Sequence, residues 1–204
     1  MVDRLLLLVE GKDDLHVIKA IMAHHDFSPD FDIKDEGGID NPLARLPVRL
    51  KPGTDLERLG IVVDADLEIA NRWAAIRNIL SKAGYNTVPA NPDPSGTIIE
   101  QDELPRIGVW VMPDNKLPGM MEDFVTLLIP EEKNALLDQA RHCVDEIPSE
   151  LLLCPNRSKV LIHTWLAWQA IPGTSLGLAI TKRYFNADGP HVTSLVSWLS
   201  RLFA

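Results

Sequence analysis

The chain has 204 residues, of which 29 are acidic and 20 basic, giving a formal net charge of −9 at pH 7. Its 46% apolar and 24% charged residues are typical of a globular protein and exclude disordered, collagen-like and disulfide-rich classes. The acidic excess also argues against a general nucleic-acid coat protein, which needs many Lys and Arg to displace counterions. The charge is uneven, because residues 1–150 carry −13 and residues 151–204 carry +4.

Short apolar runs alternate with helical periodicity along the first 130 residues. The expected strands are 4–9, 31–34, 59–63, 97–99 and 107–112. The expected helices are 12–25, 43–50, which contains Pro47, and 69–83, with a loop at 35–38 after the second strand. This alternation predicts an α/β fold with a mainly parallel sheet flanked by helices.

The remainder of the chain is expected to be helical. The predicted helices are 119–128, 131–145, 157–170, 176–184 and 192–203. We therefore predict an α/β domain at 1–128 and a helical C-terminal region at 129–204 packed on it. Residues 160–180 carry no Asp, Glu, Lys or Arg, but Pro172-Gly173 interrupt them, so we expect two buried helices and no membrane span. The tryptophans of this region, Trp165, Trp168 and Trp198, are expected in the core.

Cysteine usage and the N-terminal residues indicate a cytoplasmic protein. Cys143 and Cys154 lack CxxC spacing, which favours two reduced thiols. The apolar run at 5–9 is followed at once by Glu10 and is too short for the core of a signal peptide.

The first candidate motif, Glu10-Gly11-Lys12, follows the first predicted strand. Ligand sites of open α/β sheets form at the carboxyl ends of strands, where Glu10 is placed. Gly11 lies at the entrance of the next helix, whose amides favour phosphate, and Lys12 can add a phosphate contact. The alternative is an ordinary strand-to-helix turn, with Asp13 and Asp14 as partners of the helix dipole.

The second motif, Asp64-Ala65-Asp66, ends the 59–63 strand. In an extended chain the two carboxylates point the same way and need a cation between them. An all-oxygen site of this kind suits Mg²⁺. Glu68 lies just beyond and either joins the site or caps the following helix.

Together these motifs resemble the TOPRIM domain, which topoisomerases, bacterial primases, overcoming-lysogenisation-defect nucleases, recombination mediators and a ribosomal-RNA maturase share. The resemblance covers roughly residues 3–125, and the string Val9–Asp14 is close to the maturase form. It implies that Glu10 is the general acid or base, assisted by Lys12. It further implies that Asp64 and Asp66, with Glu10 as a possible further ligand, hold Mg²⁺ or Mn²⁺ for phosphodiester chemistry.

A third segment, 112–124, resembles the region of the lysogenisation-defect nucleases whose acids complete a two-metal site. By this resemblance Asp114 and Glu122 are candidates for a second metal, and Lys116 is a candidate substrate contact. The alternative is a turn at Asp114 and an acidic first helical turn at Glu122. In the tail, residues 163–168 with Pro172-Gly173 are similar to a small TOPRIM-like family.

Basic residues of the tail, including Lys159 and Lys182, can contact phosphate. The alternative is that these residues simply lie on solvated helix faces.

Neither tyrosine lies in a sequence context typical of a topoisomerase nucleophile, and primases need further regions that a chain of this length lacks. Three functions remain: a small Mg²⁺-dependent nuclease acting on nucleic acid; a non-catalytic binding module that partners a separately encoded ATPase; and a small-molecule phosphohydrolase.

Overall fold

A five-stranded sheet forms the centre of the protein in a computed structural model, which describes residues 4–27, 30–35, 42–51 and 53–204. Its strands are β1 (Leu5–Val9), β2 (Asp32–Asp35), β3 (Arg58–Asp64), β4 (Thr97–Ile99) and β5 (Arg106–Met112). Their order is β2-β1-β3-β5-β4, with only β4 antiparallel to its neighbour among the described strands. The predicted α/β fold with a mainly parallel sheet is therefore confirmed. Residues 36–38 of the predicted loop lie outside the described ranges.

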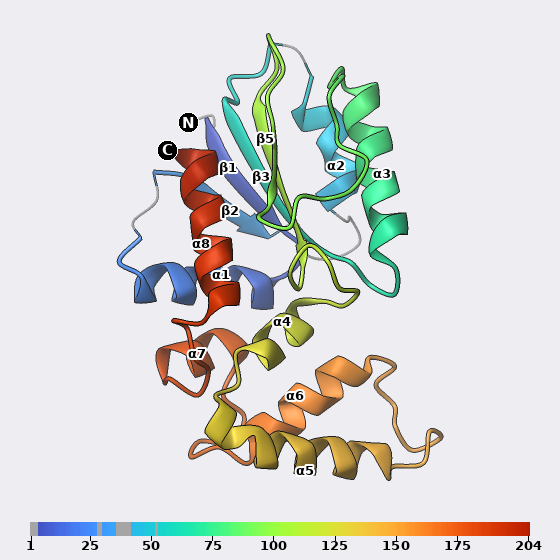
Figure 1. Cartoon of the computed structure of the whole chain (residues 1–204), viewed down its shortest axis with the longest axis vertical. Helices are drawn as coiled ribbons and strands as arrows, with labels where there is room; N and C mark the ends of the chain where they lie inside the picture. Colours follow the sequence, from blue (N-terminus) through green and yellow to red (C-terminus); the bar gives the residue numbers. More distant parts are fainter. Residues whose placement is uncertain (1–3, 28–29, 36–41, 52) are drawn as a thin grey trace.

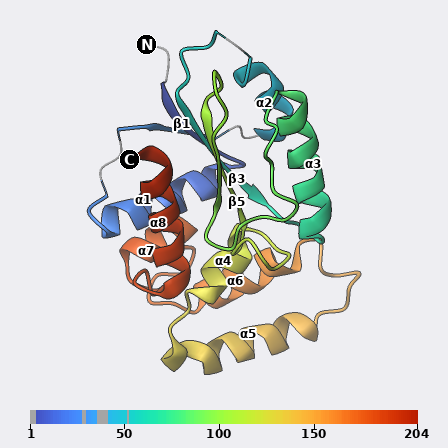
Figure 2. The same cartoon turned by 45° about the horizontal axis from the view of Figure 1, so that its top comes forward.

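Eight α-helices and one 3₁₀ turn surround the sheet in the described residues. They are α1 (Lys12–His24), α2 (Pro42–Arg49), α3 (Ile69–Lys82), α4 (Met121–Leu127), η1 (Glu131–Lys133), α5 (Asn134–Asp145), α6 (Arg157–Ala167), α7 (Leu176–Thr181) and α8 (Pro190–Phe203). Helices α2 and α3 cover one face of the sheet, and α1 and α8 cover the other (Figure 1). Helices α4 and α6 pack together, and α5 packs on α6 at the outside (Figure 2).

Both faces of the central strands are buried, which explains their continuous apolar sequences. Along β1, Leu6 and Leu8 face the core beneath α2 and α3, whereas Leu7 and Val9 face the core beneath α1 and α8. The same alternation places Val62 and Trp110 on the α1 and α8 side. Because side chains alternate along a strand, the two cores lie on opposite faces of one sheet.

Helix α8 lies against β3 and β5. Gly108 makes this close approach possible, since a Cβ atom there would lie 2.5 Å from Leu202 Cδ2. Trp198 is fully buried in the same contact, and its Nε1 donates to the Thr97 carbonyl at 3.3 Å. Residues at the C-terminal end of the chain therefore belong to the core on this side of the sheet. The boundary at residue 128 between an α/β domain and a helical region stays a prediction.

The Trp198→Ala variant should lower the free energy of unfolding by about 3–5 kcal/mol, because it opens a large cavity beneath α8. Chemical denaturation at fixed pH measures this change. Trp168→Ala is the matched control, because Trp168 is 41% exposed and its loss leaves no cavity. Equal losses in the two variants would contradict the packing described above.

Two predicted helices end three residues earlier than expected. Helix α6 ends at Ala167 and α7 ends at Thr181, so Trp168 falls on the C-cap of α6 and turns toward solvent. The expectation of a buried Trp168 is wrong for this reason, whereas Trp165 and Trp198 are buried as predicted. None of the described helices combines the length and the apolar character needed to cross a membrane. The two cysteines are free thiols.

Candidate metal centre

Strands β1 and β3 bring Glu10 and Asp64 together at their carboxyl ends. The strands are parallel and paired from Leu5 and Arg58 onward, so both ends reach the same edge of the sheet. The backbone N–H of Asp64 donates to Glu10 Oε1 at 3.3 Å. The two motifs predicted from the sequence are therefore neighbours in the fold.

A short bridge fixes the segment that follows β3. Asp66 and Gly119 exchange two backbone hydrogen bonds, of 3.0 and 2.8 Å, and this contact places the start of α4 beside β3. The Met121 amide then donates to Asp64 Oδ1 at 3.1 Å. Asp66 has φ of +55° and is not extended, so the extended-chain reason given for Asp64 and Asp66 sharing one face is wrong.

Five carboxylates gather at this edge and act on one another's protonation. They are Glu10, Asp14, Asp64, Asp66 and Glu122, here called the acidic cluster. Burial, together with the charges of the other four members, raises the pKa of Asp64 to about 9. Burial likewise raises the pKa of Asp14 to about 7 and also raises that of Glu10. The cluster therefore holds protons at neutral pH unless a cation takes their place.

Asp14 belongs to this cluster, whereas the sequence alone predicts only a partner of the helix dipole at this position. It lies on the buried side of α1, in line with Val17 and Ile18. Its Oδ1 is buried and has no hydrogen-bond partner. The available signal was its spacing, because Asp14 lies three and four residues before Val17 and Ile18, on the apolar face of the helix.

Two basic side chains border the acidic cluster. Arg72, on α3, forms an ion pair with Asp66, and its Nη1 lies 4.0 Å from Glu10 Oε1. This residue carried no recognisable sequence signal. Lys159, on α6, places its Nζ 3.5 Å from Oε1 of the buried Glu122. Lys159 thus lies at the site, as the sequence had suggested.

The acidic cluster fits a hard divalent cation. All of its candidate ligands are carboxylate oxygens, the donor type that Mg²⁺ and Mn²⁺ prefer. The unpartnered Asp14 Oδ1 and the raised pKa of Asp64 both mark a place that lacks positive charge. No three of these side chains, among the described residues, hold their ligand atoms within 4.8 Å of one another. A bound cation would therefore have to draw the carboxylates together.

Two of the predicted metal ligands lie outside the acidic cluster. Asp114 belongs to the turn after β5, where its Oδ1 accepts from the amides of Lys116 and Leu117 at 3.1 and 2.9 Å. Glu68 is exposed at the N-cap of α3, and its carboxylate accepts from Asn71 Nδ2. Both positions match the structural alternatives, a turn and a helix cap.

The predicted substrate-contacting residues other than Lys159 do not pair with members of the acidic cluster in the described residues. Gly11 is the N-cap of α1, and a Cβ atom there would approach Asp14 Oδ2 to 3.3 Å. The side chains of Lys12, Lys116 and Lys182 are exposed. No described hydrogen bond or ion pair joins these three lysines to the acidic cluster.

A hollow of about 510 Å³ opens beside the cluster, between the segment after β3 and the start of α6. Asp66 lies on its border toward the cluster, and Arg157 and Ser158 line its other side. Asp123 connects the two sides, because its carboxylate accepts from Met120 N at 2.8 Å and from Ser158 Oγ at 2.6 Å. A ligand held by the acidic cluster therefore has room to extend toward α6.

The Gly119→Ala variant should lose about 1–3 kcal/mol of stability and bind divalent cations more weakly. Gly119 has φ of +137°, and a Cβ atom there would lie 2.6 Å from Asp123 Oδ2. Thermal unfolding and Mn²⁺ titration measure the two effects. Gly173→Ala is the control, because Gly173 has φ of +78° but no atom within 4 Å of the added methyl group. Weaker Mn²⁺ binding in both variants would contradict a local role for Gly119.

Comparisons with known proteins give a match to a protein family and a similarity to a solved structure. A family model described as "Protein of unknown function (DUF3226)" matches residues 4–204. No curated protein matches the chain. The chain is similar in structure to the C-terminal region of the Xanthomonas campestris pv. campestris OLD protein, with 14% identity and a TM-score of 0.44. That alignment covers 98% of this chain and 93% of the other.

Proposed function

The chain belongs to the DUF3226 family, and we propose that it is a TOPRIM-type enzyme that cleaves phosphodiester bonds of nucleic acid with Mg²⁺ or Mn²⁺. The observation that carries this proposal is the convergence of Glu10, Asp64 and Glu122 at one sheet edge. The TOPRIM resemblance of the two acidic motifs supports the same reaction class. We also propose a cytoplasmic location, in keeping with the two free thiols.

The roles of the carboxylates follow from their surroundings. Asp64 is the most central ligand, since all four other members of the acidic cluster act on its pKa. Glu122 and Asp14 are both buried and complete the donor set. When bound, the divalent cation would polarise a phosphoryl oxygen and lower the pKa of a coordinated water.

Glu10 is suited to move a proton in this reaction. Its pKa is raised by burial and lowered by the Arg72 charge, so small changes nearby shift its protonation. Its Oε1 is oriented by the Asp64 amide. In one state the carboxylate accepts a proton from an attacking water, and in the other it donates a proton to the leaving oxygen.

The substrate class is inferred from the hollow and from the two basic side chains near it. Arg157 lines the hollow and Lys159 borders the acidic cluster, so successive phosphates of one strand could contact both. They belong to residues 151–204, which carry a net charge of +4. With few basic residues in all, binding of nucleic acid should depend on the divalent cation.

A substrate panel tests this function. The full chain is incubated with single- and double-stranded DNA and RNA and with simple phosphate esters, each with Mg²⁺, Mn²⁺ or a chelator. Cation-dependent cleavage of a nucleic acid is the expected result. Hydrolysis of phosphate esters alone would support a small-molecule phosphohydrolase instead. No cleavage of any substrate with either cation would contradict an enzymatic role.

A second function, a non-catalytic binding module, is favoured by Arg72. Its guanidinium pairs with Asp66 and lies 4.0 Å from Glu10, as a resident counterion would. Such a module would partner another protein, for example a separately encoded ATPase. Calorimetric titration with Mn²⁺ separates the two functions. Specific binding that Asp64→Asn removes supports the enzyme, whereas no binding by the intact chain favours the module.

A further inference from the structure

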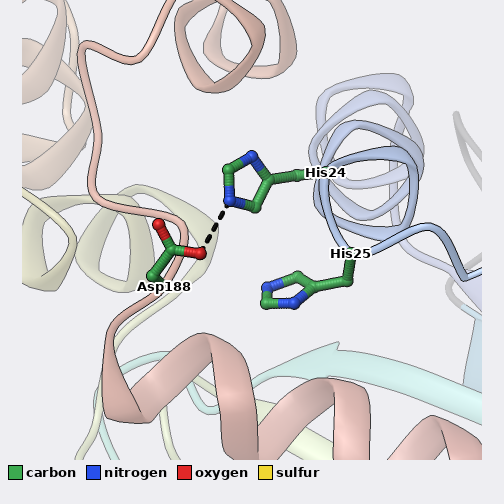
Figure 3. Close-up of side chains that lie close together, drawn as sticks. All are labelled: His24, His25 and Asp188. Carbon is green, nitrogen blue, oxygen red and sulfur yellow. Dashed lines mark hydrogen bonds and ion pairs between the residues drawn. The ribbon is translucent and has the colours of Figure 1, made fainter.

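A second group of metal-ligating side chains lies where the end of α1 meets the connection between α7 and α8. Its members are His24, His25 and Asp188, and a ligand atom from each lies within 4.8 Å of the other two (Figure 3). His24 Nε2 lies 2.8 Å from Asp188 Oδ1. His25 Nε2 lies 2.8 Å from the Ala187 carbonyl oxygen.

This group is separate from the acidic cluster. Asp14 lies near the start of α1 and His24 at its last residue, about 15 Å apart at the rise of an α-helix. The ligand types also differ, since the acidic cluster offers carboxylates alone. Two imidazoles with one carboxylate form a mixed nitrogen and oxygen set, which suits Zn²⁺ and similar transition metals better than Mg²⁺.

We propose that His24, His25 and Asp188 bind a divalent transition-metal ion of the Zn²⁺ class and thereby fasten α1 to the segment that precedes α8. Because a ring nitrogen binds a metal only without its proton, the ion would replace the hydrogen-bonding proton in the His24–Asp188 and His25–Ala187 contacts. Zn²⁺ bonds of about 2.0–2.2 Å require the 2.8 Å contact to widen by only about half an ångström. Exposed side chains such as Asp188 can make this adjustment easily.

The surroundings leave room for a further ligand. A hollow of about 630 Å³ adjoins the group, with His24 and Asp188 among its lining residues. Glu131 and Glu132, from η1, also line it and add negative charge, while Arg183 supplies a positive one. Because His24 and Asp188 face this hollow, the fourth position around the ion is left to water or to a carboxylate from η1.

Binding should stabilise the folded chain, because the three ligands come together only when α1 and the α7–α8 connection are in place. Residues 24 and 188 are far apart in sequence, so the unfolded chain has no such site. A ligand that binds only the native state raises stability in proportion to the logarithm of its concentration. Zn²⁺ should therefore raise Tm.

The test is a calorimetric titration of the chelator-treated full chain with Zn²⁺ in the presence of excess Mg²⁺. We expect one Zn²⁺ per chain, lost in His24→Ala and in Asp188→Asn. His142→Ala is the matched control, because His142 on α5 also faces a carboxylate, with Nε2 3.2 Å from Glu146 Oε1. Asp64→Asn should likewise keep the Zn²⁺, which separates this site from the proposed catalytic one.

Co²⁺ absorption of the unmutated chain gives a second readout that does not depend on how the variants fold. Intense visible bands of a four-coordinate ion, displaced by Zn²⁺, are the expected result. Zn²⁺ binding that survives both His24→Ala and Asp188→Asn would overturn the proposal. An unmutated chain that neither binds Zn²⁺ nor shows these bands would overturn it as well.

Discussion

The Glu10→Gln variant is expected to lower kcat of cation-dependent cleavage by about 10²–10⁴-fold, the usual contribution of a positioned acid or base. Glutamine keeps an oxygen for the Asp64 amide, so the local structure should be retained. Asp64→Asn is expected to act differently, because it removes the central ligand of the acidic cluster. The cleavage rate of this variant should fall, and the cation concentration that gives its half-maximal rate should shift upward. Initial rates across a Mn²⁺ series measure both effects.

Neighbouring acids supply the controls. Asp13 lies beside Asp14 in the first turn of α1, but its side chain is exposed. Asp13→Asn should therefore keep cleavage, whereas Asp14→Asn should reduce it. Asp114→Asn should also keep cleavage, since an asparagine oxygen can still accept from the turn amides. Full activity in both Glu10→Gln and Asp64→Asn would show that catalysis occurs elsewhere.

The second large effect is on stability, and it changes with pH. Burial raises the folded-state pKa of Asp64 from an ordinary value of 3.8 to about 9. Between these values the unfolded chain loses the proton while the folded chain keeps it. The free energy of unfolding therefore falls as pH rises from about 4 to about 9. Below pH 4 both states are protonated, so this group then contributes nothing to the dependence.

Asp64→Asn should remove this penalty when divalent cations are chelated. At pH 8 we expect the variant to be more stable than the unmutated chain by on the order of a few kcal/mol, or about 5–10 °C in Tm. The difference should shrink toward pH 4. Thermal unfolding across this pH range with a chelator measures it. Asp13→Asn is the control and should show no such pH-dependent gain.

Adding Mn²⁺ should reverse the order of stability. The cation offsets the charge of Asp64, Glu10 and Glu122, so the unmutated chain gains stability at pH 8 while Asp64→Asn gains little. A chain whose Tm at pH 8 does not change with Mn²⁺, or changes equally in both proteins, would contradict a metal ligand at Asp64.

The sheet and the core of the candidate site could be predicted from local sequence. The runs that form β1, β3 and β5 are apolar because both faces of these strands are buried. Parallel strands end at one edge, so Glu10 and Asp64 could be expected to meet there. Glu122 joined them only through the bridge between Asp66 and Gly119, which links segments distant in sequence.

The features that were missed depend on tertiary contacts. Asp14 and Asp13 look alike in sequence, and only the packing of α1 buries the first and exposes the second. Arg72 reaches the site because it lies in the first turn of α3, which begins shortly after β3 ends, and no local pattern marks this. The end of α6 at Ala167 left Trp168 exposed, because helix ends are set by packing and capping as much as by periodicity.

We propose above that the acidic cluster binds the divalent cation of the reaction. Crystals of the full chain grown with Mn²⁺ test it most directly, through an anomalous difference map at the manganese edge. The expected result is a Mn²⁺ ion bonded to Asp64 and to at least one of Glu10 and Glu122, with Arg72 turned away from Asp66. A map at saturating Mn²⁺ with no ion among these carboxylates would contradict it.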